Sequence, residues 1–163
     1  MELRELVRQF ISISVIHRCQ ISRSASKVGL YFGQPSILQY IIENPECTQK
    51  NVADACHISP ASVAVSLKRI EKAGLITRTS DSSDNRKKHL YVTPKGEEAL
   101  KQFRKICDTT DKEMFKGFTQ EELDTLHSLL TRLNDNLDSK SFSPEEINAL
   151  LKQSEKGDTE NDS

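Results

Sequence analysis

The sequence has 163 residues, of which 36% are hydrophobic, and its 23 Lys and Arg residues nearly balance its 24 Asp and Glu residues. That length suits one compact domain with a core of ordinary size. No apolar stretch approaches the length of a transmembrane helix, which argues against a membrane-embedded protein. The charged start, residues 1–5, lacks the apolar run of a signal peptide, so we expect no secretion.

Cysteine usage indicates a reducing compartment. The four cysteines lie far apart and form no C-x-x-C pair: Cys19, Cys47, Cys56 and Cys107. Neither a disulfide framework nor a structural zinc knuckle fits that spacing. We therefore expect free thiols, a cytoplasmic location, no metal and no other cofactor.

The charges are balanced overall but unevenly distributed. Residues 68–95 contain eight basic and three acidic residues, a local net charge of +5. Residues 138–163 contain seven acidic and three basic residues, a local net charge of −4. Because a polyanionic partner responds to the local field more than to the total charge, this balance does not exclude a nucleic-acid partner.

The first predicted elements are two helices. Apolar residues recur at helical spacing from residue 3 to about residue 22, although the run 11–15 also alternates as a strand would. We prefer a helix because the pattern is too long for an average strand. After a glycine-bounded loop over 29–33, a second helix is predicted over 35–44, with proline in its first turn and another directly after its end.

Two short helices with clear ends follow. Thr48 is a candidate N-cap for the first, and Ser59 followed by Pro60 begins the second, which ends at Gly74. The buried stripe of the second helix is predicted at Val63, Leu67 and Ile70. A helix, a tight turn and another capped helix of this size predict a helix-turn-helix.

A β-hairpin with a basic tip, or wing, is predicted next. Residues 75–79 and 89–93 have the β-branched character of strands. The polar stretch 80–88 between them has no apolar residue to bury, and 94–96 (PKG) closes the second strand as a turn.

The remainder is predicted to be helical. Residues 99–114 carry one apolar helical face, and Thr119 and Glu122 form a capping box that opens another helix. That helix repeats leucines at 3-4-3-4 spacing, at Leu123, Leu126, Leu130, Leu133 and Leu137. A seam of this kind usually meets a partner helix. A further capping box at Ser143 and Glu146 opens a short helix, and we expect the acidic tail from about residue 153 to be disordered.

The second helix of the helix-turn-helix has an outer face suited to DNA. Small side chains near its N-terminus would let it enter a major groove about 12 Å wide. Serine hydroxyls suit phosphates or base edges, small apolar groups suit thymine methyls, and basic residues suit the backbone. The candidate contacts are Ser59, Ala61, Ser62, Ala64, Val65, Ser66, Lys68 and Arg69. The alternative is a solvated helix face, which we disfavour because the basic hairpin follows directly.

The hairpin tip supplies the other candidate contacts. Arg86 lies on a loop long enough to reach a narrow minor groove, whose negative potential attracts a guanidinium. Asp84 would orient Arg86, because a carboxylate that faced DNA directly would be repelled. Lys87 and Lys88 would contact phosphates. Taken alone, residues 84–88 fit an ordinary polar turn better than a DNA contact.

Three runs occur together at specific spacing. They are 70–76 (IEKAGLI) leading to Arg78, the Asp84-x-Arg86 pair, and 92–96 (VTPKG). In this order they resemble the multiple-antibiotic-resistance regulator (MarR) family of winged-helix transcription factors, and the flanking helices extend the likeness to about Leu137. Asn85, where a basic residue is frequent, and the segment after Asp138 depart from the family pattern.

The resemblance implies a mainly α fold with a small β-hairpin wing and an intertwined homodimer. Arg86 would enter the minor groove with Asp84 as its support, and 59–68 would form the recognition-helix surface. Two recognition helices would lie roughly 34–36 Å apart, matching a pseudo-palindromic operator. The residues predicted at the dimer interface are Leu3, Leu6, Phe10, Leu123, Leu126, Leu130, Leu133 and Leu137. Packing of these helices within one chain is the alternative.

The resemblance also implies a ligand pocket between the dimer helices and the winged domain, often for aromatic anions. Its candidate residues are His17, Arg18, Tyr31, Phe32 and Tyr40, each of which also fits plain core packing. Cys19 lies near where some relatives carry an oxidation-sensing thiol, so a redox-sensing regulator is an alternative. A lone cysteine among apolar residues is more often a small buried hydrophobe.

These observations define a predicted organisation and function. The predicted segments are an N-terminal dimerisation helix and loop (1–30), a winged helix-turn-helix (34–96), C-terminal dimerisation helices (97–138), and a short helix with an acidic tail (139–163). We predict a ligand-responsive repressor that binds double-stranded DNA. No phosphate loop, G-x-S-x-G or H-E-x-x-H motif indicates an enzyme. A winged-helix protein–protein adaptor is the remaining alternative, and the basic hairpin tip argues against it.

Overall fold

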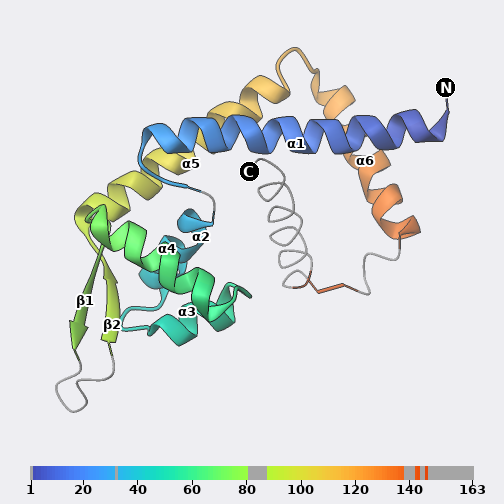
Figure 1. Cartoon of the computed structure of the whole chain (residues 1–163). Helices are drawn as coiled ribbons and strands as arrows, with labels where there is room; N and C mark the ends of the chain where they lie inside the picture. Colours follow the sequence, from blue (N-terminus) through green and yellow to red (C-terminus); the bar gives the residue numbers. More distant parts are fainter. Residues whose placement is uncertain (1, 32, 81–87, 138–141, 144–145, 147–163) are drawn as a thin grey trace, which may run out of the picture. The chain divides into compact units, whose positions relative to one another are not determined.

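The computed structural model describes residues 2–31, 33–80, 88–137, 142–143 and 146 (Figure 1). The chain is mainly helical with one two-stranded antiparallel hairpin, which confirms the predicted fold class. It divides into two compact units, residues 1–114 and residues 115–163. Within the described ranges, no helix combines the length and the apolar character needed to cross a bilayer.

The first helix is longer than predicted. Helix α1 spans Leu3–Lys27, whereas we expected its end near Ser22. The residues after Ser22 include neither glycine nor proline, so nothing stops the helix until the chain reaches Gly29, whose φ is +76°. The stretch 11–15 is helical, so its alternation does not indicate a strand.

The helix-turn-helix forms as predicted. Helix α2 spans Gln34–Glu43, helix α3 spans Gln49–Ala55 and helix α4 spans Pro60–Lys72. The Thr48 hydroxyl accepts a hydrogen bond from the backbone N–H of Asn51, while the Asn51 side chain accepts one from the backbone N–H of Thr48. This reciprocal pair satisfies two donors that a helix start otherwise leaves without partners.

Each strand of the hairpin is shifted by one residue from its predicted position, toward the loop that joins the two strands. Strand β1 spans Ile76–Ser80 and strand β2 spans Lys88–Val92, with Ile76 opposite Val92 and Ser80 opposite Lys88. Leu75 is outside the strand because its N–H bonds the Ile70 carbonyl oxygen at 2.9 Å and so finishes the end of α4.

The segment 94–96 is helix rather than a turn. Helix α5 spans Pro94–Met114, so the proline that we read as closing the hairpin occupies the first helical position instead. Its missing N–H costs nothing there, because the first helical N–H groups have no partner within the helix. Thr93 therefore precedes α5 directly and does not end a strand.

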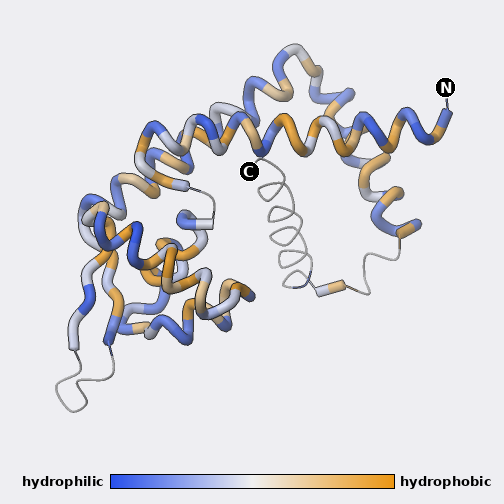
Figure 2. The backbone as a smooth tube through the Cα atoms, in the orientation of Figure 1, coloured by the Kyte–Doolittle hydropathy of each residue, from blue (hydrophilic) through white to orange (hydrophobic). Residues whose placement is uncertain are grey.

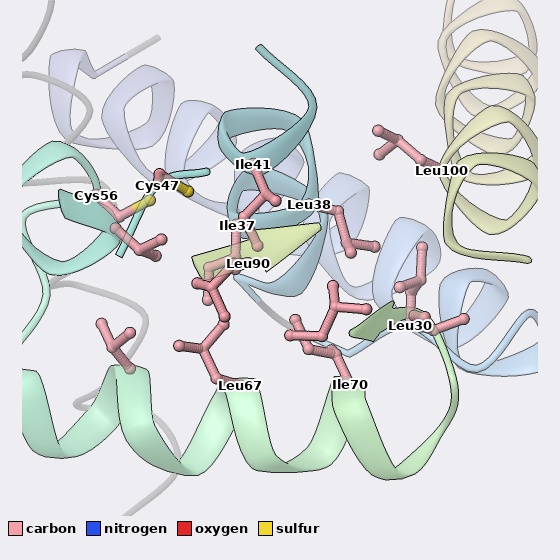
Figure 3. Close-up of a cluster of buried hydrophobic side chains, with 14 of the residues drawn as sticks. Leu30, Ile37, Leu38, Ile41, Cys47, Cys56, Leu67, Ile70, Leu90 and Leu100 are labelled. Carbon is pink, nitrogen blue, oxygen red and sulfur yellow. The ribbon is translucent and has the colours of Figure 1, made fainter. Parts of the chain in front are cut away.

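The core lies inside the winged helix-turn-helix. Leu67 and Ile70 of α4 point toward Ile37 and Leu38 of α2 and Leu90 of β2 (Figure 3). All five side chains are at most 1% exposed. Val63 completes the buried stripe of α4, so the predicted spacing of this stripe is confirmed.

The second unit contains one long described helix. Helix α6 spans Gln120–Asn136 and begins at the predicted capping box, in which the Thr119 hydroxyl accepts from the N–H of Glu122. Just before this helix, the rings of Phe115 and Phe118 pack edge to face, with their centroids 5.9 Å apart. The second predicted capping box also forms, between Ser143 and Glu146. The rest of the predicted short helix and the acidic tail lie outside the described residues.

Leu67→Ala should destabilise the winged domain by about 2–5 kcal/mol, since it removes buried methyl groups and leaves a cavity. Urea denaturation followed by circular dichroism would measure the loss. Val65→Ala is the matched control on the same helix, because Val65 is 51% exposed and a surface change should stay within about 0.5 kcal/mol. Equal effects of the two variants would contradict this placement of the core.

Candidate nucleic-acid interface

The start of α4 is built by two serines. The Ser59 hydroxyl caps the helix by accepting from the backbone N–H of Ser62, at an N–O distance of 3.2 Å. It also donates to the Ser62 hydroxyl at 2.9 Å. The two hydroxyls therefore hold one another at the positive end of the helix dipole, where an incoming phosphate is favoured.

The face of α4 opposite the buried stripe carries the predicted DNA contacts. Ser59, Ala61, Val65, Lys68 and Arg69 are exposed. The other three predicted contacts are half-buried: Ser62, Ala64 and Ser66. The structure thus brings all eight residues to one side of a single helix, with small side chains near its start and cations near its end.

The turn that presents α4 is tight. The N–H of Ile58 bonds the Ala53 carbonyl oxygen at 3.2 Å, which finishes α3 just before the turn. His57 lies exposed in this turn with φ of +50°, a conformation that is uncommon for a residue other than glycine. No pattern in the sequence indicated that His57 adopts this conformation.

The wing is described only at its base. Lys88 begins β2 and is exposed. The other predicted wing contacts, Arg86 and Lys87, and their predicted support Asp84 lie outside the described residues. The roles assigned to them therefore stay predictions.

The base of the wing is tied to α4 by an ion pair. Arg78 Nε of β1 lies 2.9 Å from Glu71 Oε2 in the last turn of α4. Arg78 contributes to the local net charge of +5, but it is half-buried and engaged with Glu71. The basic field of this region therefore comes from its other cations, of which Lys68, Arg69 and Lys88 are exposed.

The C-terminal end of α4 is also joined to the start of α5. The Thr93 hydroxyl donates to the Gly74 carbonyl oxygen at 2.7 Å and accepts from the Gly96 N–H at 3.1 Å. The Lys95 ammonium donates to the Ala73 carbonyl oxygen at 2.7 Å. The sequence predicted a strand end and a turn over 92–96 and did not indicate these contacts with the end of α4.

The predicted dimer residues leave much apolar surface exposed in each unit. On α1, Leu3 is 80% exposed and Phe10 is exposed, while Leu6 is half-buried. On α6, no described residue is buried, and Leu130, Leu133 and Leu137 are exposed while Leu123 and Leu126 are half-buried. Apolar residues recur along both helices in Figure 2. Exposed apolar surface of this extent is typical of an interaction site.

The described residues that were predicted to line a ligand pocket differ in their surroundings. His17 of α1 bonds Asp111 of α5, with 2.7 Å between Nε2 and Oδ1. Tyr31 is 59% exposed, Tyr40 packs against the core, and Arg18 is half-buried. Phe32 lies outside the described residues.

Two hollows lie between α1 and α5. One, of about 380 Å³, is lined by Ser24, Val28, Gln102, Lys105, Ile106, Thr109 and Thr110. The other, of about 260 Å³, is lined by Ile13, Ile16, His17, Gln20, Glu113 and Met114. Only His17 of the predicted pocket residues lines either hollow.

None of the four cysteines forms a disulfide, and their exposures differ. Cys19 is exposed on α1, Cys107 is half-buried on α5, and Cys47 and Cys56 are buried. Burial raises the pKa of the Cys47 thiol, and the nearby Cys56 adds to that rise. Burial also raises the pKa of Cys107, with Asp111 and Asp108 adding to it. Among the described residues, no three His, Cys, Asp or Glu side chains cluster as a metal site would require.

These features define a winged helix-turn-helix protein. The capped helix α4 presents a small and basic face, and the hairpin beside it is anchored to the last turn of that helix. Helices before and after the winged domain expose apolar surface.

Known proteins share this arrangement. The sequence model of the MarR family matches residues 28–87. An uncharacterised HTH-type transcriptional regulator of Bacillus subtilis, YybA, is 29% identical over 106 residues, covering 65% of this chain and 71% of its own. A structure of a MarR family transcriptional regulator from Clostridium acetobutylicum is 28% identical, with a TM-score of 0.70 over 81% of this chain and 98% of its own.

A third similarity concerns the fold alone. A mutant of the Staphylococcus aureus protein MepR, solved bound to an oligodeoxyribonucleotide, is 22% identical with a TM-score of 0.67, covering 81% of this chain and 97% of its own. The chain is therefore similar to the MarR family of transcriptional regulators, in sequence over residues 28–87 and in fold. The resemblance that the sequence runs indicated is thereby confirmed.

Cys47 and Cys56 should resist alkylation by iodoacetamide in the folded protein, because both thiols are buried and the raised pKa of Cys47 lowers its thiolate fraction. Both should react once the protein is unfolded in urea. Because the folded state favours the neutral Cys47 thiol, stability should fall as the pH rises above 9. Mass spectrometry of labelled peptides would measure the protection, and rapid native labelling of Cys47 would contradict its burial.

Proposed function

We propose that this regulator binds double-stranded DNA as a homodimer and represses transcription by occupying a pseudo-palindromic operator, from which a small ligand releases it. The exposed face of α4 carries this proposal. Its small residues suit close approach to base edges, and Lys68 and Arg69 suit the phosphate backbone. The protein–protein adaptor has no comparable use for a cationic face of this kind.

Homodimerisation is supported by the apolar surfaces of α1 and α6. A two-fold pair would cover leucine and phenylalanine side chains that a single chain leaves exposed to water. It would also present two copies of α4 to one face of a duplex, about one helical turn apart. Recognition of a pseudo-palindromic operator therefore depends on homodimerisation, because a single α4 reads only half of such a site.

Ligand release is supported by the larger hollow between α1 and α5. The Lys105 ammonium offers a donor to an anion, and Val28 and Ile106 offer apolar contact. This chemistry suits a small aromatic or amphipathic anion. A ligand that bound better to a dimer with wrongly spaced recognition helices would shift the population away from the DNA-bound form.

Arg86→Ala should weaken binding to a duplex selected from random sequences by about 1.5–3 kcal/mol, the range for hydrogen bonds to charged groups. The slope of log affinity against log salt should also become shallower by about one. Fluorescence anisotropy at several salt concentrations would measure both quantities.

Lys112→Ala is the matched control for Arg86→Ala. It likewise removes one cation, but Lys112, which is exposed, lies about 27 Å along α5 from Pro94, where the winged domain joins the helix. We expect no change in the affinity or in the salt slope. An Arg86→Ala protein that binds as the wild type does would contradict the proposed role of the wing.

Leu130→Asp should dissociate the dimer, because it would bury a carboxylate among the leucines of the α6 seam in the proposed interface. Sedimentation equilibrium would show a shift toward the monomer mass. Ser128→Asp adds the same charge to an exposed position on the opposite face of α6 and should leave the dimer intact. A dimer unaffected by Leu130→Asp would refute this interface.

A further inference from the structure

One hydroxyl joins the ends of two helices in the winged domain. Thr93 Oγ1 caps α5 by accepting from the N–H of Gly96, and it donates its own proton to the carbonyl oxygen of Gly74, directly after α4. Both helix ends have backbone groups that the helices themselves cannot satisfy. The single Thr93 hydroxyl satisfies one group at each end.

Two further bonds run between the same helix ends. The Thr93 N–H donates to the Leu75 carbonyl oxygen at 3.0 Å. The Lys95 ammonium donates to the Ala73 carbonyl oxygen and places a positive charge at the negative end of the α4 dipole. Gly96 lets the two segments approach, since a Cβ there would lie 2.2 Å from the Leu75 carbonyl oxygen.

These contacts lie between the proposed dimer helices and the proposed DNA-reading helix. Farther along α5, Asp111 is bonded to His17 of α1, so α5 and α1 are tied together. At its other end, α5 meets the last turn of α4, which is also held by the Glu71–Arg78 ion pair. The orientation of α5 is therefore transmitted to α4 at the α4 C-terminus.

The contacts of Thr93 and Lys95 with residues 73–75 form a joint between α4 and α5. Because α4 is long, the position of its N-terminal end is sensitive to the angle at this joint. Its 13 residues span about 20 Å, and the candidate base contacts lie near the end farthest from the joint. A rotation of about 10° at the C-terminus would displace that end by about 3 Å, estimated from the helical rise. Hydrogen bonds to bases do not tolerate a displacement of this size, because the range of acceptable donor–acceptor distances is only about 0.5 Å wide.

We propose that Thr93 is a positioning residue for operator recognition. Its hydroxyl fixes the angle between α5 and α4, and in the dimer this angle sets the separation of the two recognition helices. This inference rests on the proposed function, in which a homodimer reads a pseudo-palindrome. Thr93 touches no DNA in this arrangement and acts through α4.

The test compares Thr93→Val, which keeps the side-chain shape and removes the hydroxyl, with Thr93→Ser, which keeps the hydroxyl. Thr131→Val is the matched control, because the Thr131 hydroxyl likewise donates to a backbone carbonyl oxygen, that of His127 in its own helix. Each protein is titrated against the selected operator, against operators with one base pair inserted or deleted between the half-sites, and against a random duplex.

For Thr93→Val we expect about fivefold to tenfold weaker binding to the selected operator, the effect of losing about one net hydrogen bond. Binding to the random duplex should change less than twofold. The preference for the correct spacing over the altered spacings should shrink by a similar factor. Thr93→Ser should restore that preference, and Thr131→Val should retain it.

A purely structural role gives a different result. If Thr93 only stabilised the fold, Thr93→Val would lower the melting temperature and leave the spacing preference of the folded dimer unchanged, which would overturn the proposal. If Thr93→Val does not fold, Lys95→Met takes its place. It removes one bond of the same joint, and an unchanged spacing preference would again overturn the proposal.

The experiment separates this inference from the proposed function. A wild-type protein that binds no selected operator better than a random duplex would refute the proposed function itself. A wild-type protein that discriminates spacing, with a Thr93→Val variant that discriminates equally well, would refute only the positioning role of Thr93.

Discussion

The burial of one stripe of α4 is the constraint on which the rest of the structure depends. Val63, Leu67 and Ile70 pack inside the winged domain, so the opposite side of the helix must face outward. Because a helix has a fixed period of 3.6 residues, this single choice determines that the small and basic side chains are presented together. The candidate interface is thus a consequence of core packing.

The ends of α4 are as important as its buried face. At its start, Ser59 and Ser62 order their own hydroxyls, and at its end the chain is held by Glu71–Arg78 and by Thr93. A helix buried along one stripe can still slide or rotate slightly. Polar contacts at both ends remove this freedom, because hydrogen bonds depend on distance and direction more strongly than apolar contacts do.

Local chemistry explains which elements were predictable. The caps at Thr48, Ser59 and Thr119 act within four residues, so their sequence signatures identified the helix starts. The predicted end of α1 was wrong by more than one helical turn, since no local signal stops that helix before Gly29. Pro94 was misread as a turn because proline suits both a turn and a first helical position.

The sequence by itself determined the helix-turn-helix, the hairpin, the outward face of α4 and the resemblance to the MarR family, because these follow from periodicity, caps and motif spacing along the chain. Only the tertiary structure decided that Arg78 is engaged with Glu71, that His17 meets Asp111, and that Thr93 joins α4 to α5. The partners in the last two contacts are 94 and 19 residues apart along the chain. Side-chain contacts of this kind leave no periodic trace, since they depend on how separate elements pack.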